Sequence, residues 1–193
     1  MSETPETELI ARAQKRDRDA IAELYRRYVQ AIARYIAYRV SDEAIVEDLT
    51  AEVFLRMVEA LPHYRVTGAP FEAWLYRIAA ARIADYYRQA DRHPQHELSD
   101  GLQAGPLSLE GSVEQHEEVE ALRAALRQLT VDQQTILVLR FVERKSHDEV
   151  ARILGKSPEA VATAQHRALK QLARLMGTDK TDRHYLRGNL HDS

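Results

Sequence analysis

The sequence predicts an all-α protein with two helical domains, joined by an acidic, flexible linker, and with a helix-turn-helix in the second domain. Glycine and proline number only seven and six among 193 residues, which are otherwise rich in alanine, leucine, arginine and glutamate. Apolar residues recur at spacings of three and four along both halves of the chain. A polar stretch with many acids separates the two halves. These observations together predict the fold class.

The composition also limits the class of protein. The formal net charge is −3, so any contact with nucleic acid must come from local basic patches. The chain has no cysteine, which excludes disulfides, thiolate nucleophiles and cysteine-based zinc sites. The N-terminus lacks a basic leader followed by an apolar run, and no window approaches the roughly 18 apolar residues of a membrane span. We therefore expect a cytoplasmic protein without direct membrane insertion.

Residues 1–91 are expected to form the first domain. Two apolar stripes at helical spacing predict its first two helices. Ser41 is a suitable N-cap for the second of these helices, and Pro62 ends it. The first stripe contains Ile21, Leu24, Tyr25, Tyr28, Ile32 and Ile36. The second stripe contains Ile45, Val46, Leu49, Val53, Met57 and Leu61.

A third helix is predicted to begin at Pro70, because proline is favoured at the first helical position. It follows the polar stretch HYRVTGA. Phe71 and Trp74 then open an apolar pattern that Leu75 and Ile78 continue. We expect these aromatic side chains to pack in the core of the domain.

Residues 92–116 are the predicted linker. From His93 to Glu120 the sequence has seven acids, no lysine and no arginine, and such a composition is poorly able to form a core. Its end, from about Ser112, has a helical pattern. His93, His96 and His116 offer nitrogen ligands, but solvated linker histidines are the favoured interpretation, and we predict no metal site.

Residues 117–176 are expected to form the second domain, followed by a polar tail at 177–193. Thr130 with Gln133 and Ser146 with Glu149 are two capping boxes, each of which starts a helix. The first of these helices is expected to turn four apolar side chains toward the core. They are Ile136, Leu137, Leu139 and Phe141.

The second capping box begins a helix-turn-helix pattern. Val150, Ile153 and Leu154 form the inner face of a short helix, and Gly155 suits the left-handed turn that ends it. Ser157-Pro158 is an N-cap followed by proline at the first helical position. The residues available to bury the next helix are Val161, Ala164, Ala168, Leu169 and Leu172.

Three separated segments, in this order, resemble the extracytoplasmic-function (ECF) group of bacterial sigma factors. They are EDLTAEVFLRMVEALPHYR, FEAWLYRIAAARIADYYRQ and LRQLTVDQQTILVLRFVERKSHDEVARILGKSPEAVATAQHRALKQL. The resemblance covers residues 20–172, most of the chain. It implies an all-helical initiation factor whose first domain binds core RNA polymerase and opens the promoter at the minus-ten element. The second domain would read the minus-thirty-five element.

The helix predicted around residues 47–59 has a mainly acidic face with an outward leucine, opposite its apolar stripe. Charged faces are usually only solvated, but this one suits a helix-to-helix protein interface. The resemblance implies that it docks on the clamp helices of the polymerase's largest subunit. Ala51 stands where the family commonly has a glutamine. The candidate polymerase-binding residues are Asp48, Glu52, Leu55 and Arg56.

Promoter opening requires that bases are captured as they leave the stack, by aromatic faces and basic groups. The resemblance implies that the loop from Tyr64 to Ala69 holds an unstacked base. The next helix interleaves arginines with aromatics, and a core helix with a solvated basic edge is the alternative interpretation. Ala81 replaces an asparagine that the family often has, so no base preference follows. The candidate minus-ten residues are Tyr64, Arg65, Thr67, Gly68, Arg77, Arg82, Tyr87 and Arg88.

A helix-turn-helix reads base edges with the N-terminal part of its second helix, while phosphate contacts supply much of the affinity. Ala162 and Ala164 stand where the family usually has cations. Helical geometry predicts that Ala162 faces outward and that Ala164 faces the core margin. We therefore expect weak discrimination by this domain alone and dependence on tethering to polymerase. The candidate minus-thirty-five residues are Lys156, Ser157, Ala162, Thr163, Gln165, His166, Arg167 and Lys170.

The expected partners are core RNA polymerase, through its largest-subunit clamp helices and its flap, promoter DNA, and an anti-sigma factor. The acidic linker would either cover the DNA-binding faces in the free protein or act as a spacer. A conventional helix-turn-helix repressor or activator, acting without polymerase docking, is the alternative function. An enzyme is not expected, because the sequence has no glycine-rich phosphate loop and no metal-ligand cluster, and no cofactor is predicted.

Overall fold

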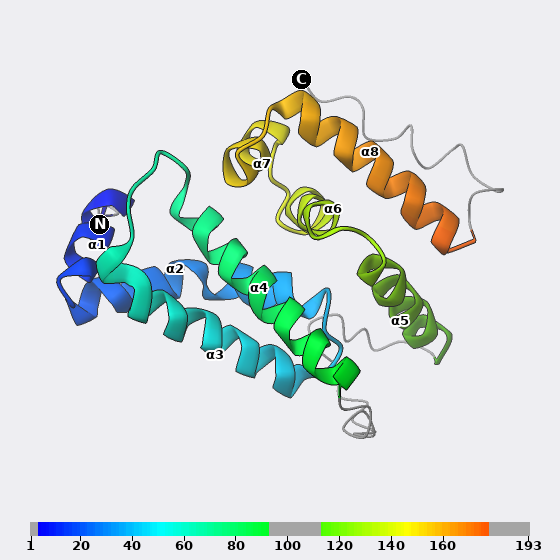
Figure 1. Ribbon diagram of the computed structural model, residues 1–193, viewed down its shortest axis with the longest axis horizontal. Coiled ribbons are helices and arrows are strands. Elements are labelled where there is room, and N and C mark those ends of the chain that lie inside the picture. Colours follow the sequence, from blue (N-terminus) through cyan, green and yellow to red (C-terminus); the bar gives the residue numbers. More distant parts are fainter. Residues whose placement is uncertain (1–3, 93–112, 178–193) are drawn as a thin grey trace.

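The computed structural model describes residues 4–92 and 113–177, which contain α-helices and short helical turns but no strand (Figure 1). The first group of helices is α1 (Glu6–Gln14), α2 (Arg18–Ala37), α3 (Glu43–Ala60), the 3-10 turn η1 (Leu61–His63) and α4 (Phe71–Arg92). The second group is α5 (Val113–Arg127), α6 (Val131–Leu137), the π turn η3 (Val138–Val142), α7 (His147–Leu154) and α8 (Pro158–Leu175). The all-α fold class is confirmed.

The predicted linker and tail lie largely outside the described ranges. The end of the 92–116 segment belongs to α5, as the helical pattern near Ser112 predicted. His93 and His96 are also outside, so the linker histidines stay untested as ligands. Among residues 4–92 and 113–177, none of the helices is long and apolar enough to span a bilayer.

Helices α2, α3 and α4 pack against one another in the first domain, and α1 lies at one end of this bundle (Figure 1). The predicted stripes form its core: Leu24, Ile32, Val53, Met57 and Leu75 are fully buried. Each such side chain stabilises the fold by roughly 1.5–3 kcal/mol relative to its exposed state. The alternating apolar and polar faces of α2 and α3 therefore determine how the three helices meet.

Tyr25 was predicted to face the core, but it is 45% exposed. Its ring packs edge-on against Phe54, with 4.8 Å between the ring centroids. Position 25 follows Leu24 and is rotated by about 100° around the helix, which places it at the margin of the stripe. There it lines an apolar pocket of about 370 Å³ between α2 and α3, together with Met57 and Val58.

Ser41 was predicted to cap α3, and this is wrong by one residue. The N-cap is Asp42, whose carboxylate accepts hydrogen bonds from the backbone amides of Ala44 (2.9 Å) and Ile45 (3.2 Å). A carboxylate is the stronger acceptor at a helix N-terminus because its charge also interacts favourably with the helix dipole. The hydroxyl of Ser41 instead donates to Glu120 of α5 at 3.0 Å.

The helix-turn-helix is formed by α7, the turn at residues 155–157, and α8, as predicted. Both capping boxes are present, at Thr130 and at Ser146. Gly155 has φ of 64°, in the left-handed region that glycine adopts without steric cost. Ser157 caps α8 by accepting from the amide of Ala160, and proline follows it at the first helical position. Local sequence signals therefore fix the angle between α7 and α8.

Phe141 was predicted to face the core of the second domain, but it is 53% exposed. The reason is the π turn that follows α6. The amide of Glu143 donates to the carbonyl of Val138, five residues earlier, at 3.1 Å. The wider turn rotates the residues within it relative to a 3.6-residue helix. Ile136 and Leu139 keep their predicted buried positions.

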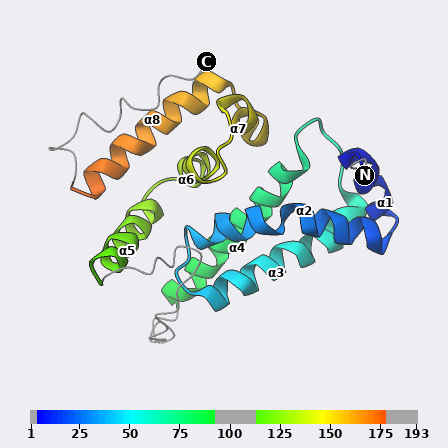
Figure 2. The ribbon, with the colours of Figure 1, turned by 180° about the vertical axis from the view of Figure 1, so that it is seen from behind.

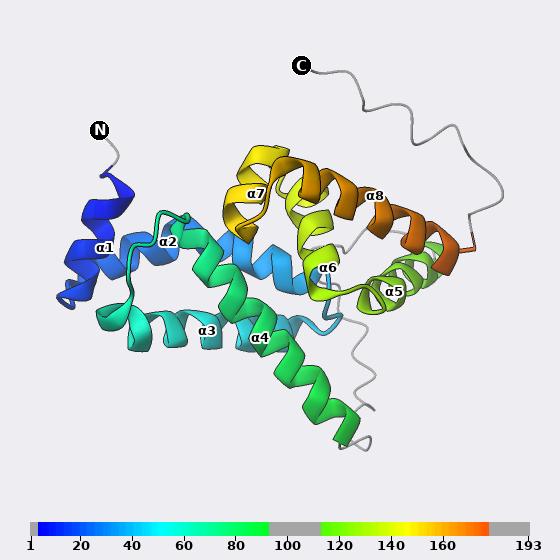
Figure 3. The ribbon, with the colours of Figure 1, turned by 45° about the horizontal axis from the view of Figure 1, so that its top comes forward.

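The second domain docks on the first, with α6 and α7 lying nearest to α2 and α4 (Figure 2, Figure 3). Buried apolar residues of α6 and α7, among them Ile136 and Val150, join the same core cluster as those of the first bundle. The sequence analysis made no prediction of this docking, because the contacts that form it join residues far apart in the chain.

Polar contacts line the seam between the domains. Tyr35 of α2 meets Thr135 of α6 at 2.8 Å. The threonine hydroxyl donates to the Val131 carbonyl, so the tyrosine hydroxyl is the donor in the seam. Arg39 is 3% exposed, lies 3.7 Å from the centre of the Tyr35 ring, and donates to Gln134 at 2.7 Å. Burial lowers the pKa of Arg39, and the Tyr35 contact opposes that shift.

Two ion pairs close the edges of the seam. The guanidinium of Arg34 contacts both carboxylate oxygens of Glu143 at 2.8 Å. Lys145 contacts Glu72, the second residue of α4, at 2.9 Å. The Glu143 hydrogen bond raises the pKa of Arg34. Both pairs join α2 or α4 to the short segment that follows η3, so charge complementarity orients the second domain.

Charge reversal at the seam should separate the two domains. Glu143→Arg places a second cation beside Arg34 and should weaken docking by about 1–3 kcal/mol, because it removes a bidentate charged contact. The chain has no cysteine, so dyes can be attached through Ala44→Cys and Arg174→Cys, at exposed positions on α3 and α8. Energy transfer should fall in Glu143→Arg.

The double variant Arg34→Glu with Glu143→Arg should recover the transfer efficiency, because it restores the pair with its charges exchanged. Glu118→Arg is a matched control, since this exposed acid lies outside the seam. Equal transfer in wild type and Glu143→Arg would contradict the role of this ion pair.

Candidate polymerase and nucleic-acid interfaces

The candidate polymerase-binding residues share one face of α3. Asp48, Glu52, Leu55 and Arg56 are all exposed, and Leu55 is 58% exposed. Arg56 pairs with Glu59 at 3.2 Å along the helix surface. The face is thus an acidic surface with one apolar side chain at its centre, and the opposite face of α3 is buried in the bundle.

The candidate minus-ten loop joins η1 to α4. Arg65, Thr67 and Gly68 are exposed, and Gly68 has φ of 82°, which a residue with a Cβ rarely adopts. Tyr64 lies deeper, with its ring centroid 4.7 Å from that of Trp74 and 5.2 Å from that of Phe71. Burial raises the pKa of Tyr64. The aromatic cluster therefore anchors the start of the loop and leaves its middle open to solvent.

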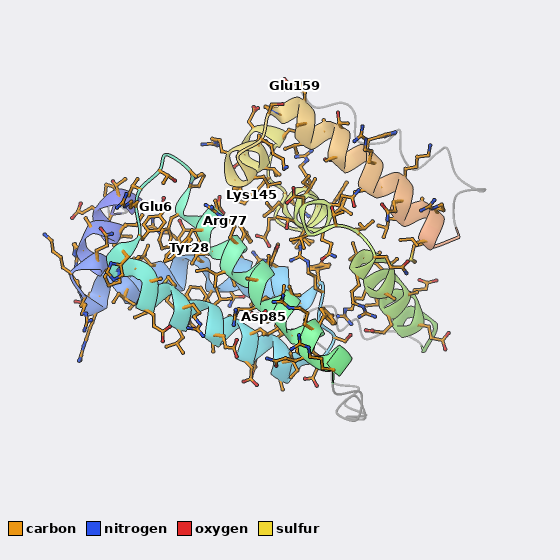
Figure 4. The ribbon with its side chains drawn as sticks, in the orientation of Figure 1. Glu6, Tyr28, Arg77, Asp85, Lys145 and Glu159 are labelled. Atoms are coloured by element: carbon orange, nitrogen blue, oxygen red, sulfur yellow. The ribbon has the colours of Figure 1, made fainter. Side chains whose placement is uncertain are left out.

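The candidate arginines on α4 are spread along the helix. Arg77 is exposed near the loop, and its Nε donates to the Ala73 carbonyl at 3.3 Å. Arg82 and Arg88 lie further along and both pair with Asp85, which is labelled with Arg77 in Figure 4. The hydrogen bond from Arg88 is the main cause of the lowered pKa of Asp85. These two cations are therefore already partly neutralised.

Tyr87 lies on the side of α4 that faces the seam. Its hydroxyl donates to the backbone carbonyl of Arg39, and the guanidinium of Arg127 lies 5.8 Å from the centre of its ring. Burial raises the pKa of Tyr87, while Arg127 lowers it. The structure thus places Tyr87 with the interdomain contacts and away from the exposed loop residues.

The candidate minus-thirty-five residues lie on α8 and the turn before it. Lys156 pairs with Asp132 at 2.9 Å, and the hydroxyl of Ser157 is used as the N-cap. Ala162 is exposed and Ala164 is half-buried against the core, as helical geometry predicted. The other exposed candidates are Thr163, His166, Arg167 and Lys170.

Gln165 is held by its neighbours. Its side-chain oxygen accepts from Nε of Arg140 and contacts Nε2 of His147, each at 3.1 Å. These contacts orient its amide nitrogen and connect α8 to both preceding helical segments. Arg140 and His147 were not among the predicted site residues, because partners 25 and 18 residues away leave no local sequence pattern.

No metal centre is found in the part of the chain that the structure describes: its histidines, aspartates and glutamates include no group of three placed to hold an ion. The described surfaces offer instead an acidic and apolar helix face, a loop beside arginines, and a helix-turn-helix with a basic second helix. Such features bind protein and nucleic acid by surface complementarity and phosphate contacts.

Comparison with known proteins assigns both helical domains to one class of factor. The family model for sigma-70 region 2 matches residues 24–93, and the model for sigma-70 region 4 matches residues 119–172. The two helical domains are therefore sigma regions 2 and 4, which together define an RNA polymerase sigma factor.

Two relatives place the chain within that class. It is 38% identical over 174 residues to the ECF RNA polymerase sigma factor BldN of Streptomyces coelicolor, and the match covers 89% of this chain and 66% of BldN. It is 35% identical over 173 residues to the ECF RNA polymerase sigma factor SigD of Mycobacterium tuberculosis, covering 85% of this chain and 80% of SigD. The chain belongs to the ECF family of sigma factors, which direct promoter-specific transcription initiation.

A solved structure has the same fold. The structure of CnrH in complex with the cytosolic domain of CnrY aligns with a TM-score of 0.61 and 24% sequence identity. The alignment covers 89% of this chain and 96% of CnrH. The likeness therefore extends over both helical domains.

Basic substitutions at two positions on α8 should distinguish its DNA-facing side from its core-facing side. Ala162→Lys adds an exposed cation and should strengthen binding of the full chain to DNA of many sequences. The slope of log K against log salt should steepen by about 0.9, the value for one added phosphate contact. Ala164→Arg should instead lower the free energy of unfolding by about 1–3 kcal/mol through overpacking at a half-buried site.

Fluorescence anisotropy over a salt series measures the first effect, and thermal melts measure the second. If Ala164→Arg raised affinity and slope with an unchanged melting temperature, while Ala162→Lys changed neither, the assigned DNA-facing side of α8 would be wrong.

Proposed function

We propose that this sigma factor binds core RNA polymerase through the exposed face of α3, opens the minus-ten element with the loop before α4, and docks the minus-thirty-five element with α8. The observation that carries the proposal is the occurrence of these three exposed surfaces in one chain, in the order of sigma regions 2 and 4. A conventional repressor needs only the helix-turn-helix and gives no reason for the other two surfaces.

The α3 face is suited to a helical partner. Leu55 supplies an apolar contact that binding can bury, and the carboxylates of Asp48 and Glu52 surround it with negative charge. A complementary surface would therefore be helical and basic, with an apolar residue opposite Leu55. The resemblance to the family names the clamp helices of the polymerase's largest subunit as this surface.

The loop is suited to a base that has left the stack. Arg65 and Thr67 are exposed beside a glycine that lets a nucleotide approach the backbone closely. Because the Tyr64 ring packs on Trp74 and Phe71, the capture of a base relies on the exposed loop residues and backbone, and Tyr64 supports them from below. Arg77 lies next along α4, at a position suited to a phosphate.

The α8 surface is suited to a backbone-centred contact with duplex DNA. Arg167 and Lys170 are exposed cations, while Ala162 and Thr163 at the N-terminal part of the helix are small. Small residues discriminate weakly between base pairs, and phosphate contacts give affinity without sequence preference. Recognition of the minus-thirty-five element would therefore depend on the tether to polymerase.

Simultaneous use of both DNA surfaces requires the domains to separate. The two elements lie about 25 base pairs apart, which is about 85 Å of B-form DNA. In the docked arrangement α7 contacts α4 directly. The 20 residues from 93 to 112 can reach at most about 70 Å. That length, with the size of the domains themselves, is sufficient for the span.

An anti-sigma factor is the proposed regulatory partner. The resemblance to the ECF group implies one. A further sigma factor with a similar fold, RpoE of Bartonella quintana, was solved in complex with the anti-sigma factor NepR; it aligns with a TM-score of 0.54 and 20% identity. A cytoplasmic location follows from the requirement to meet polymerase and DNA.

Run-off transcription tests the function directly. Core polymerase is incubated with fragmented genomic DNA, with and without this protein, and the 5′ ends of the transcripts are mapped. New start sites with a shared upstream pattern are expected. Protection of DNA in the absence of polymerase, without any new transcript, would favour the repressor.

Charge reversal on α3 should abolish polymerase binding. Asp48→Arg with Glu52→Arg inverts the charge of an exposed face without touching the core, so helicity should be unchanged while affinity for core polymerase falls at least 100-fold, about 2.7 kcal/mol. Glu117→Arg with Glu118→Arg is the matched control, because it changes the net charge equally on α5. Retention of the folded α3 variant by polymerase would rule out this interface.

A further inference from the structure

Helix α1 contacts the start of the candidate minus-ten loop, although it lies outside the sigma region 2 match at residues 24–93. The contact is made by Gln14, the last residue of α1. Its side-chain amide donates to the backbone carbonyl of Leu61 at 3.2 Å and to that of Tyr64 at 2.7 Å. One side chain thus binds both ends of the turn η1 from which the loop departs.

These two carbonyls lie where the helical turn ends and the loop begins. The last carbonyls of a helix have no partner within it, and here the chain leaves the helix at Tyr64, which has extended backbone angles. The Leu61 carbonyl also accepts from the Tyr64 amide at 3.0 Å. This oxygen therefore accepts one hydrogen bond from within the turn and one from Gln14 of α1. An amide with two N–H donors matches two converging carbonyls, and this sets the direction in which the loop leaves.

The same helix also supports the end of the loop indirectly, through Tyr28 of α2. Glu6 accepts a hydrogen bond from the hydroxyl of Tyr28, and the two side chains lie together in Figure 4. The Tyr28 ring packs on Phe71, the first residue of α4, with 5.8 Å between centroids. Phe71 in turn contacts Tyr64. Helix α1 therefore contacts Tyr64, which precedes the exposed stretch, and supports Phe71, which follows it, through Tyr28.

Helix α1 is itself firmly placed. Leu9, Ile10 and Ala13 are at most 3% exposed and belong to the core cluster of the first domain. Arg12 pairs with Asp17, the N-cap of α2, at 2.8 Å, which fixes the angle between the two helices. An anchored helix can transmit a fixed geometry to the loop, which a mobile N-terminal segment could not do.

We infer that α1 is a positioning element for promoter opening and that Gln14 is its positioning residue, holding the loop in the shape that receives an unstacked base. This inference rests on the proposed function of the loop. A loop held in its binding shape loses less conformational freedom when it binds a nucleotide, so affinity for the opened strand is higher. Gln14 does not contact DNA in this role; it acts through the backbone of Leu61 and Tyr64.

Two substitutions distinguish the effect of the hydrogen bonds that Gln14 donates from the effect of its packing. Gln14→Met keeps the length of the side chain and removes both donors, whereas Gln14→Lys keeps donors that can reach the two carbonyls. Loss of two hydrogen bonds shifts the conformational equilibrium of the loop by roughly tenfold. We therefore expect Gln14→Met to lower promoter opening by about that factor, and Gln14→Lys to restore most of it.

The measurement is permanganate reactivity of unpaired thymines in the complex of full-length protein, core polymerase and promoter. Trp74 supplies a second readout, because it is the only tryptophan in the chain and its ring lies against Tyr64. In Gln14→Met its emission should shift to longer wavelength and be quenched more strongly by acrylamide. Polymerase affinity should be unchanged, and circular dichroism sets a temperature at which all variants are fully helical.

The double variant Arg65→Ala with Thr67→Ala tests the role of the loop separately from the role of Gln14. If it lowers reactivity while Gln14→Met changes neither reactivity nor Trp74 emission, the role of Gln14 is refuted and the proposed function of the loop stands. If neither variant lowers reactivity, the loop does not capture the strand and the inference about Gln14 fails with it. A parallel loss in both variants, with recovery in Gln14→Lys, supports the inference.

Discussion

The hydrogen bond between the hydroxyls of Tyr35 and Thr135 joins the two domains, and the position of the α8 surface relative to the α3 face and the loop depends on that docking. The groups around it are polar, and each can bond to water when the domains part, so each contributes only about 0.5–1.5 kcal/mol to docking. The guanidinium of Arg39 bonds to Gln134 and lies over Tyr35, but it is buried without a carboxylate from the described residues, so its desolvation offsets part of this gain. Burial of apolar residues from α6 and α7 favours docking. The balance of these terms is that of a moderately stable interface, as the proposed separation of the domains on a promoter would need.

The features that could be predicted from the sequence are those whose partners lie close in the chain. The capping boxes and the left-handed Gly155 depend only on residues within one helical turn. The outward direction of Ala162 follows from helical geometry alone. The errors have local physical causes: a stronger acceptor beside Ser41, and a π turn that rotated Phe141 outward. Contacts across 47 to 109 residues, such as those that Gln14, Arg34 and Tyr35 make, leave no periodic signal, so the docking and the support of the loop emerged only in three dimensions.

The cations near the candidate DNA surfaces are often paired with acids on the same surface. Asp85 serves both Arg82 and Arg88, and Asp132 pairs with Lys156. Surface pairs of this kind are worth about 0–1 kcal/mol, so under the proposed function a phosphate could replace the carboxylate at little cost. In the free chain the same carboxylates reduce the positive field that would attract any DNA, in keeping with a net charge of −3. The pairing of these arginine and lysine side chains with acids is visible only in the structure.

The loop before α4 is supported by contacts from both domains. Its start is held by Gln14 within the first domain, whereas just after its end Glu72 pairs with Lys145 of the second domain. When the domains separate, the second contact is lost and the first remains. In such a separated state the shape of the loop would come from α1 and from Phe71, which is 1% exposed and packs on Tyr28 and Tyr64 within the first domain. The contact from α1 lies wholly within the first domain, so under the proposed function it would hold the start of the loop whether or not the domains are docked.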